Sequence, residues 1–282
     1  MIRFITDSTC EAPDQLLSNP AVTVVPLYVL FGQESLRDNV DISREEFWKR
    51  LPAAKTLPTT SQVPPSGFLA PFREYTDAGD EVIALVISGK LSRTYDSAIS
   101  AQSEIPDRPI DVVDSLTTSV GLGLLLQDGL RMAEAGKTRA EIVARLNALR
   151  SNVHLLFALE TLEYLARGGR IGKAQAFLGT TLNLKPLLAV VDGEIVPVSR
   201  ARGKRKALQD MIDHLAHLVT VRGPKVQLAV THACVPEEAD EVAKALSARF
   251  ESPNVWGASL GPVLGTHVGP GTIGAAAYVS DW

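Results

Sequence analysis

Apolar runs and amphipathic segments alternate along the chain. Runs rich in β-branched residues cover residues 2–6, 81–87 and 110–114, which is typical of strands covered on both faces. Segments with helical spacing separate the runs, and two of them begin with capping-box spacing, at Ser43 and Thr138. This alternation predicts an α/β fold with a mostly parallel sheet and helices on both of its faces.

Polar clusters divide the first half of the chain. Asp7-Ser8-Thr9 ends the first strand, and residues 22–30 predict a second strand. The stretch Thr60-Ser61-Gln62 follows a segment with two prolines, which favours a loop. Ser66 is a candidate N-cap for a helix over residues 67–78. We therefore expect a hydroxyl-bearing loop shortly before the apolar strand at 81–87.

The second half contains a β-hairpin. Residues 185–191 and 194–199 flank Asp192-Gly193, which is a strong two-residue turn signal. Further strands are expected at 154–159, 225–231 and 254–260 and in a last run through Val279, with helices at 203–220 and 236–250. We place the boundary near Ser151-Asn152. This division gives an N-terminal α/β lobe of residues 1–152, a C-terminal α/β lobe of residues 153–282 and a ligand cleft between them.

The stretch 85–99 holds the first candidate site. A buried-strand pattern ends at Ser88-Gly89-Lys90, and Ser92, Arg93 and Thr94 then open a helix. Hydroxyls and amides at the carboxyl end of a strand, beside a positive helix terminus, are typical of an anion site in an open α/β sheet. The alternative is that Ser92 only caps the helix.

Two glycine-rich motifs in the second half provide further candidates. In the first, two glycines precede Arg170, whose guanidinium offers a planar fork to oxygen anions. A helix is expected to follow, to about Leu178. In the second, glycines and a proline over residues 265–274 predict a tight loop that holds His267. Such a histidine is either structural or directed at a ligand.

A run of five cations stands before and at the start of the helix expected from residue 203. It consists of Arg200, Arg202, Lys204, Arg205 and Lys206. Runs of charge are commonly solvated surfaces. Cations are unfavourable near a helix N-terminus, however, so a docking role is the alternative.

Composition excludes several classes of protein. The chain has 282 residues and a net charge of -4, which disfavours a general nucleic-acid binder. The longest apolar run is too short to span a membrane, and the first residues lack a signal-peptide pattern, so we expect a cytoplasmic protein without membrane insertion. Cys10 and Cys234 have no metal-ligand spacing, and no nucleotide fingerprint is present. We expect no metal and no cofactor.

Six motifs in order resemble one known family. They are 5–9, 60–62, 88–98, 162–172 with its Arg-Gly-Gly-Arg, 200–205 and 267–271. Together they are similar to the bacterial DegV family of fatty-acid-binding proteins, over nearly the whole chain. The resemblance implies a two-lobed α/β fold with a long-chain fatty acid buried between the lobes. In some members the carboxylate is presented to the catalytic subunit of a fatty acid kinase, which forms an acyl phosphate for phospholipid synthesis.

The resemblance also assigns residues. The expected fatty-acid-binding set is Thr60, Ser61, Ser92, Arg93, Thr94, His267 and Gly269. Arg170 is expected near the acyl phosphate, and Arg202 is expected to face the kinase. The chain has Val63-Pro64 where the family usually has Pro-Ser, and Arg93 where it usually has Gly. We expect the isolated protein to be a monomer.

The physical chemistry favours a carrier over a catalyst. Burial of an acyl chain contributes about 0.8 kcal/mol per methylene, while hydroxyls and amides select a carboxylate. Ser92 has no adjacent activating group in the sequence. The alternative is an α/β hydrolase or phosphotransferase that assembles Asp7, Ser92 and His267. A DNA-binding regulator conflicts with the acidic charge.

Overall fold

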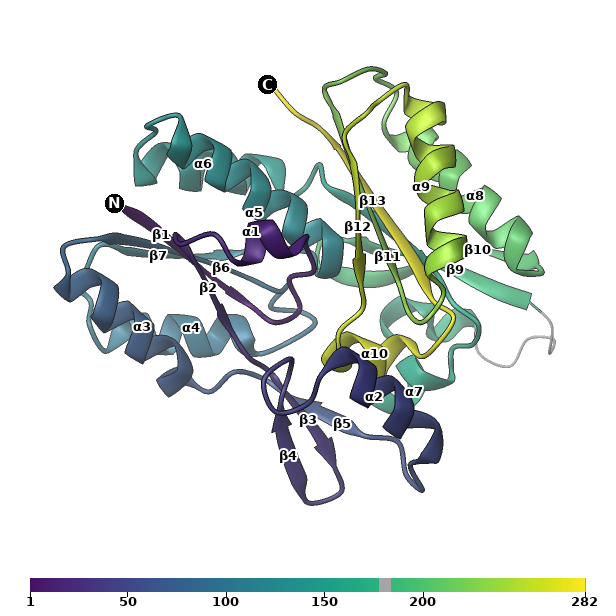
Figure 1. The fold of residues 1–282 in the computed structure, drawn as a ribbon, viewed down its shortest axis with the longest axis horizontal. Helices are drawn as coiled ribbons and strands as arrows, with labels where there is room; N and C mark the ends of the chain where they lie inside the picture. Colours follow the sequence, from purple (N-terminus) through teal and green to yellow (C-terminus); the bar gives the residue numbers. More distant parts are fainter. Residues whose placement is uncertain (178–183, 282) are drawn as a thin grey trace.

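The first half of the chain forms a four-stranded parallel sheet in the order β2-β1-β6-β7 (Figure 1). The computed structural model describes residues 1–177 and 184–281. The strands are β1 (Ile2–Asp7), β2 (Val22–Val25), β6 (Glu81–Val86) and β7 (Ile110–Asp114). Side chains of α3 (Pro65–Asp77) and α4 (Thr94–Ser103) pack on one face, and those of α5 (Ser119–Glu134) and α6 (Arg139–Leu149) on the other. The predicted parallel sheet with helices on both faces is confirmed.

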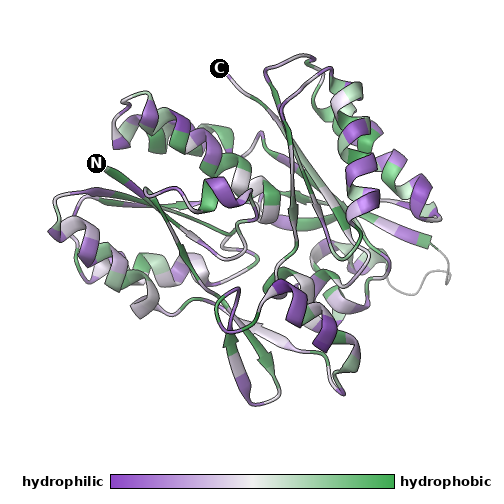
Figure 2. Cartoon of the chain, viewed as in Figure 1, coloured by the Kyte–Doolittle hydropathy of each residue, from purple (hydrophilic) through white to green (hydrophobic). Residues whose placement is uncertain are grey.

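The second half forms a six-stranded mixed sheet in the order β10-β9-β8-β13-β11-β12. Its strands are β8 (His154–Ala158), β9 (Leu184–Val191), β10 (Glu194–Arg202), β11 (Val226–His232), β12 (Val255–Ser259) and β13 (Ile273–Val279). The predicted hairpin is confirmed, and both Asp192 and Gly193 have the positive φ angles that such a turn requires. Helices α8 (Lys204–Leu218) and α9 (Pro236–Phe250) cover one face. In Figure 2 these two helices carry both hydrophobic and hydrophilic stretches, as expected for surface helices.

Helix α5 lies between the two sheets. Twelve of its sixteen residues are buried, because it packs on the parallel sheet and also on β8, β11 and β13. One hydrophobic core therefore extends from Phe4 of β1 to Tyr278 of β13. The Tyr278 hydroxyl donates a hydrogen bond to Asp128 of α5 at 3.1 Å. The lobe boundary at 152/153 remains our proposal, since this core is shared.

The prediction of a single strand over residues 22–30 was wrong. Pro26 follows β2, and proline has no N–H for the ladder and restricts the residue before it. The chain instead enters a separate antiparallel sheet of β3 (Tyr28–Phe31), β4 (Glu34–Arg37) and β5 (Thr59–Ser61). The loop predicted at 60–62 is therefore mostly a strand. Its partner is β3, in which Val29 pairs with Thr60.

Several helix boundaries also differ from the prediction. Helix α3 begins at Pro65 after the N-cap Pro64, so Ser66 is not its cap. His267 lies in a short helix, α10 (Pro262–Val268), and not in a loop. The remaining short helices are α1 (Asp14–Leu17), α2 (Arg44–Arg50), η1 (Leu51–Ala53), α7 (Glu163–Gly168) and η2 (Gly172–Phe177). Leu178, the expected end of the helix after Arg170, lies outside the described residues.

Among residues 1–177 and 184–281, no helix is both long and apolar enough to cross a membrane.

Candidate functional site

Residues from both halves of the chain line a narrow cavity. The space between its lining atoms, including the part that is open to solvent, is about 810 Å³. Its apolar lining consists of Leu27, Ile87, Leu91, Leu155, Phe157, Leu165, Val190, Ile195, Leu260, Val263, Leu264 and Val268. Its polar lining consists of Thr60, Ser61, Gln62, Ser92, Thr118, Ser119, Arg170, Thr231, His267 and Thr272. This arrangement suits a long apolar ligand with one polar end.

The floor of the cavity is the inner face of the mixed sheet. Gly274 of β13 pairs with Thr231 of β11 on one side and with Phe157 of β8 on the other. All three line the cavity. A Cβ atom on Gly274 would lie 2.9 Å from the Thr231 methyl carbon. The missing side chain therefore leaves space for a ligand above the sheet at this residue.

Thr60 and His267 meet at the polar part of the cavity. The Thr60 Oγ1 atom lies 2.8 Å from His267 Nε2, and this contact joins β5 to α10. His267 is only 8% exposed. Burial, with a smaller contribution from Arg170, lowers the pKa of His267 from 6.5 to about 4. The imidazole is therefore neutral at physiological pH.

The close approach of Gly168 holds the His267 ring in place. A Cβ atom on Gly168 would overlap His267 Nδ1, so only glycine fits here without a shift. Nδ1 itself is buried and has no hydrogen-bond partner in the described part of the chain. The Arg-Gly-Gly-Arg motif thus supports His267 as well as providing Arg170.

Ser92 and Ser61 line the same cavity. Ser92 Oγ accepts a hydrogen bond from the Thr94 amide at 3.2 Å and lies 2.9 Å from Thr94 Oγ1. The N-cap of α4 is Arg93, whose side chain makes no capping bond. Ser92 therefore supports the start of the helix locally and also faces the cavity. Both hypotheses from the sequence, a helix-supporting role and an anion-binding role, remain compatible with this position.

Three of the expected binding residues do not line the cavity. Thr94 is buried beneath Ser92 as its hydrogen-bond partner. Arg93 is exposed and pairs with Asp96 at 3.5 Å. Gly269 ends α10 with a positive φ angle, and a Cβ atom there would overlap the Tyr164 ring. Gly269 therefore shapes the turn after His267.

Arg170 lies where the cavity approaches a second, outer hollow. Both spaces share Leu91, Arg170 and Ile195. Arg170 is exposed, and its guanidinium donates to the Gly168 carbonyl at 3.0 Å. Among the described residues that line the cavity, it is the one with a permanent charge.

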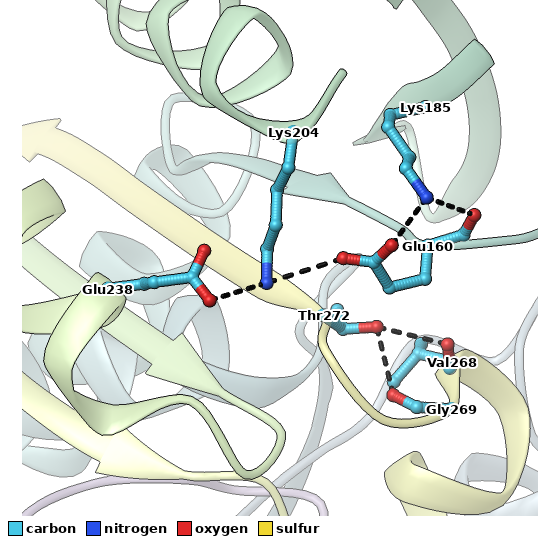
Figure 3. Close-up of polar contacts among 7 residues, drawn as sticks. All are labelled: Glu160, Lys185, Lys204, Glu238, Val268, Gly269 and Thr272. Carbon is cyan, nitrogen blue, oxygen red and sulfur yellow. Dashed lines mark hydrogen bonds and ion pairs between the residues drawn. The ribbon is translucent and has the colours of Figure 1, made fainter. Parts of the chain in front are cut away.

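The basic run is divided between β10 and α8. Lys204, at the start of α8, lies 2.9 Å from Glu238 and 3.3 Å from Glu160, which also pairs with Lys185 (Figure 3). In the same view, Thr272 donates to the carbonyls of Val268 and Gly269, behind the turn that ends α10. Arg200 lies over the Phe177 ring and Lys206 pairs with Asp210. Arg202 and Arg205 are exposed and have no ion pair within residues 1–177 and 184–281.

The structure does not assemble the alternative catalytic set. Asp7 accepts hydrogen bonds from Thr9 and from the Ile87 amide, whereas His267 contacts Thr60. Ser92 contacts Thr94. Within the described residues, no hydrogen bond links any two of the three groups.

A buried polar group that was not predicted from the sequence lies beside the cavity. Glu11 accepts hydrogen bonds from Ser119 and Thr231, both of which line the cavity, and from the Gly261 amide. The nearby cluster Asp7-Ser8-Thr9 indicated only that polar residues follow the first strand, since such residues commonly continue past the carboxyl end of a parallel strand. It gave no indication that Glu11 would be buried.

Comparisons with known proteins place these observations in a family. The family model described as "Uncharacterised protein, DegV family" matches residues 1–280. A DegV domain-containing protein of Deinococcus radiodurans is 35% identical over 275 residues, covering 98% of this chain and 97% of that protein.

Solved structures agree with the sequence comparison. A DegV family protein from Thermus thermophilus, described by its fatty acid binding, has 35% identity and a TM-score of 0.92 over 99% of both chains. A stearic acid-binding protein from Eubacterium ventriosum has 29% identity and a TM-score of 0.89, covering 99% of this chain and 98% of that one. With the expected α/β fold in place, the chain belongs to the DegV family.

Proposed function

We propose that this protein binds a long-chain fatty acid in the cavity between its lobes. The observation that carries the proposal is the lining, which combines twelve apolar side chains with the hydroxyls of Thr60, Ser61 and Ser92. The fatty-acid-binding relatives from Thermus thermophilus and Eubacterium ventriosum support the choice of ligand.

The carboxylate lies at the hydroxyl end in this proposal. Thr60 and Ser92 donate hydrogen bonds to it, and the neutral His267 orients Thr60 through the 2.8 Å contact. Arg170 provides positive charge at the mouth. The acyl chain then follows the apolar wall over Gly274, where each buried methylene contributes about 0.8 kcal/mol before the cost of association.

The proposal extends to a partner. An acyl phosphate carries more negative charge than a carboxylate, so cations at the mouth matter more for the phosphorylated state than for the free acid. Arg170 lies at that mouth, and the exposed Arg202, which has no ion pair in the described part of the chain, offers a contact for a fatty acid kinase. In this role the protein is the non-catalytic subunit that presents the fatty acid for acyl-phosphate formation.

Extraction of the purified protein followed by mass spectrometry tests the binding proposal. We expect a long-chain fatty acid at near-equimolar ratio. Lipid-free protein that also fails to bind C14 to C18 acids in calorimetry would contradict it, and kinase-coupled phosphorylation of the loaded protein tests the second part separately.

A further inference from the structure

Two buried carboxyl groups from the first half of the chain lie at the start of α10. Glu11 is fully buried, and its Oε1 accepts a hydrogen bond from the Gly261 amide at 2.6 Å. Asp38 is 2% exposed, and the amide of Val263 is close enough to lower its pKa. A Cβ atom on Gly261 would lie 3.5 Å from Asp38 Oδ1. Both carboxyl groups therefore face the first turn of the helix that carries His267.

Each carboxyl group also bonds to a second part of the protein. Glu11 Oε2 accepts hydrogen bonds from Ser119 at 2.5 Å and from Thr231 at 2.9 Å. Asp38 Oδ2 accepts one from Ser8 at 2.8 Å. The Glu11 bonds connect the start of α10 to the cavity wall, and the Asp38 bond ties a carboxyl group that lies beside Gly261 to the residue after β1.

Helix α10 forms one wall of the cavity and also packs against the N-terminal lobe. Val263, Leu264, His267 and Val268 line the cavity. On the opposite side, the Trp48 indole donates to the Leu260 carbonyl at 3.3 Å, and a Cβ atom on Gly265 would lie within 3.0 Å of the Phe47 and Trp48 rings. In Figure 1, α10 lies next to α2. A shift of α10 would therefore open the cavity wall and separate His267 from Thr60.

We propose that Glu11 and Asp38 are positioning residues that clasp the first turn of α10 and so control the release of ligand from the cavity. The inference rests on the proposed function only for the identity of that ligand. The proposed effect of Glu11 and Asp38 on the position of α10 does not depend on which ligand is bound.

The proposal gives a defined pH dependence. Burial raises the pKa of both carboxyl groups to about 7. A shifted α10 would expose them to water, where a carboxyl pKa is about 4. The clasped form then binds protons more tightly than the open form, so opening becomes more favourable as pH rises from about 4.5 through about 7.

The surrounding charges are few. Arg44 of α2 attracts both carboxylates, and the two carboxylates repel one another, so they titrate as a pair. Asp7 and Cys10 lie on the segment of Glu11 itself. The groups that face Glu11 from α5, β11 and α10 are Ser119, Thr231 and Gly261, which are uncharged.

The test measures release of a fluorescent C18 acid, cis-parinaric acid, at about pH 5.5 and about pH 8. We expect the wild-type release rate to rise at least about fivefold, with a ceiling of about thirtyfold for each of the two carboxyl groups from the pKa difference. Glu11→Gln and Asp38→Asn mimic the protonated clasp and should each flatten this rise. Asp128→Asn is the matched control, because Asp128 is a fully buried carboxyl group that bonds to Tyr278 of β13 and pairs with Arg145 of α6.

Amide hydrogen exchange over residues 260–269 of the lipid-free protein provides a second readout. After correction for the intrinsic rate, protection should fall with pH in the wild type and fall less steeply in Glu11→Gln, in which Asp38 still titrates. Probe binding with unchanged pH dependence in both variants would overturn the clasp and leave the proposed function standing. A wild type that binds no fatty acid but shows the pH-dependent exchange would contradict the proposed function and leave the clasp standing.

Discussion

Thr60 and His267 are 207 residues apart in the sequence, yet their side chains meet at 2.8 Å. Because His267 Nδ1 is buried and has no hydrogen-bond partner among the described residues, and buried unpaired N–H groups are rare, we infer that Nε2 carries the proton. Nε2 then donates to Thr60 Oγ1. The Thr60 hydrogen is left to point at the carboxylate of a ligand.

Thr60→Val should weaken fatty-acid binding by about five- to tenfold, since it removes one hydrogen bond to the carboxylate while keeping the side-chain shape. Calorimetry with a C16 acid measures the change. Thr59→Val is the control, because Thr59 is the exposed neighbour in β5. The corresponding fatty alcohol should bind wild type and Thr60→Val with a smaller difference; an equal loss for acid and alcohol would argue against a head-group role.

His267 should stay neutral across physiological pH in the lipid-free protein. Its pKa is lowered from 6.5 to about 4, so the unfolded chain binds a proton that the folded chain does not. The free energy of unfolding should therefore rise between about pH 4 and about pH 6.5, and His267→Gln should reduce this rise. His217→Gln, on the exposed side of α8, is the control.

NMR of the imidazole nitrogens extends the same prediction to the complex. A carboxylate within a few ångströms favours the charged ring, so bound fatty acid should raise the pKa of His267. An unchanged titration on binding would place the head group elsewhere.

Ser92→Ala should lower fatty-acid affinity while costing no more than about 1 kcal/mol of stability, because Ser92 makes a local bond to Thr94 but is not the N-cap. Ser100→Ala is the control, since its hydroxyl bonds within the same helix on the exposed side. A loss of protein stability with unchanged fatty-acid affinity would indicate that Ser92 only stabilises the start of α4 and does not bind the ligand.

Arg202→Ala should weaken a complex with a fatty acid kinase and reduce its salt dependence, and leave fatty-acid affinity unchanged. Lys206→Ala is the control within the same run, because Lys206 already pairs with Asp210. Biosensor titrations at two salt concentrations measure both. Equal effects of the two substitutions would indicate a general charge effect and not a contact at Arg202.

Much of the fold follows from local patterns. Strand β6 of the parallel sheet is buried on both faces, so it produces an apolar run that needs no partner to be recognised. The hairpin at Asp192-Gly193 likewise depends on two adjacent residues. The three-stranded sheet could not be predicted in this way, since β5 is a strand only because Thr60 pairs with Val29, far away in the sequence.

The candidate site shows the same division. The hydroxyls of Thr60 and Ser92 and the fork of Arg170 were predicted and line one cavity. Glycines disfavour a helix, so the helix that contains His267 was not expected. Gly265 is nevertheless helical, and its missing side chain allows the helix to pack closely on Phe47 and Trp48. Glu11 was not predicted, since its partners Ser119, Thr231 and Gly261 lie 108, 220 and 250 residues away.

The most direct test of the account is the electron density of this protein crystallised with a C16 or C18 fatty acid. We expect a continuous chain of density along Phe157 and Gly274, with the carboxylate within hydrogen-bond distance of Thr60 and Ser92 and Arg170 at the mouth. Density that places the carboxylate at the opposite end, or an acyl chain bound outside the cavity, would contradict it.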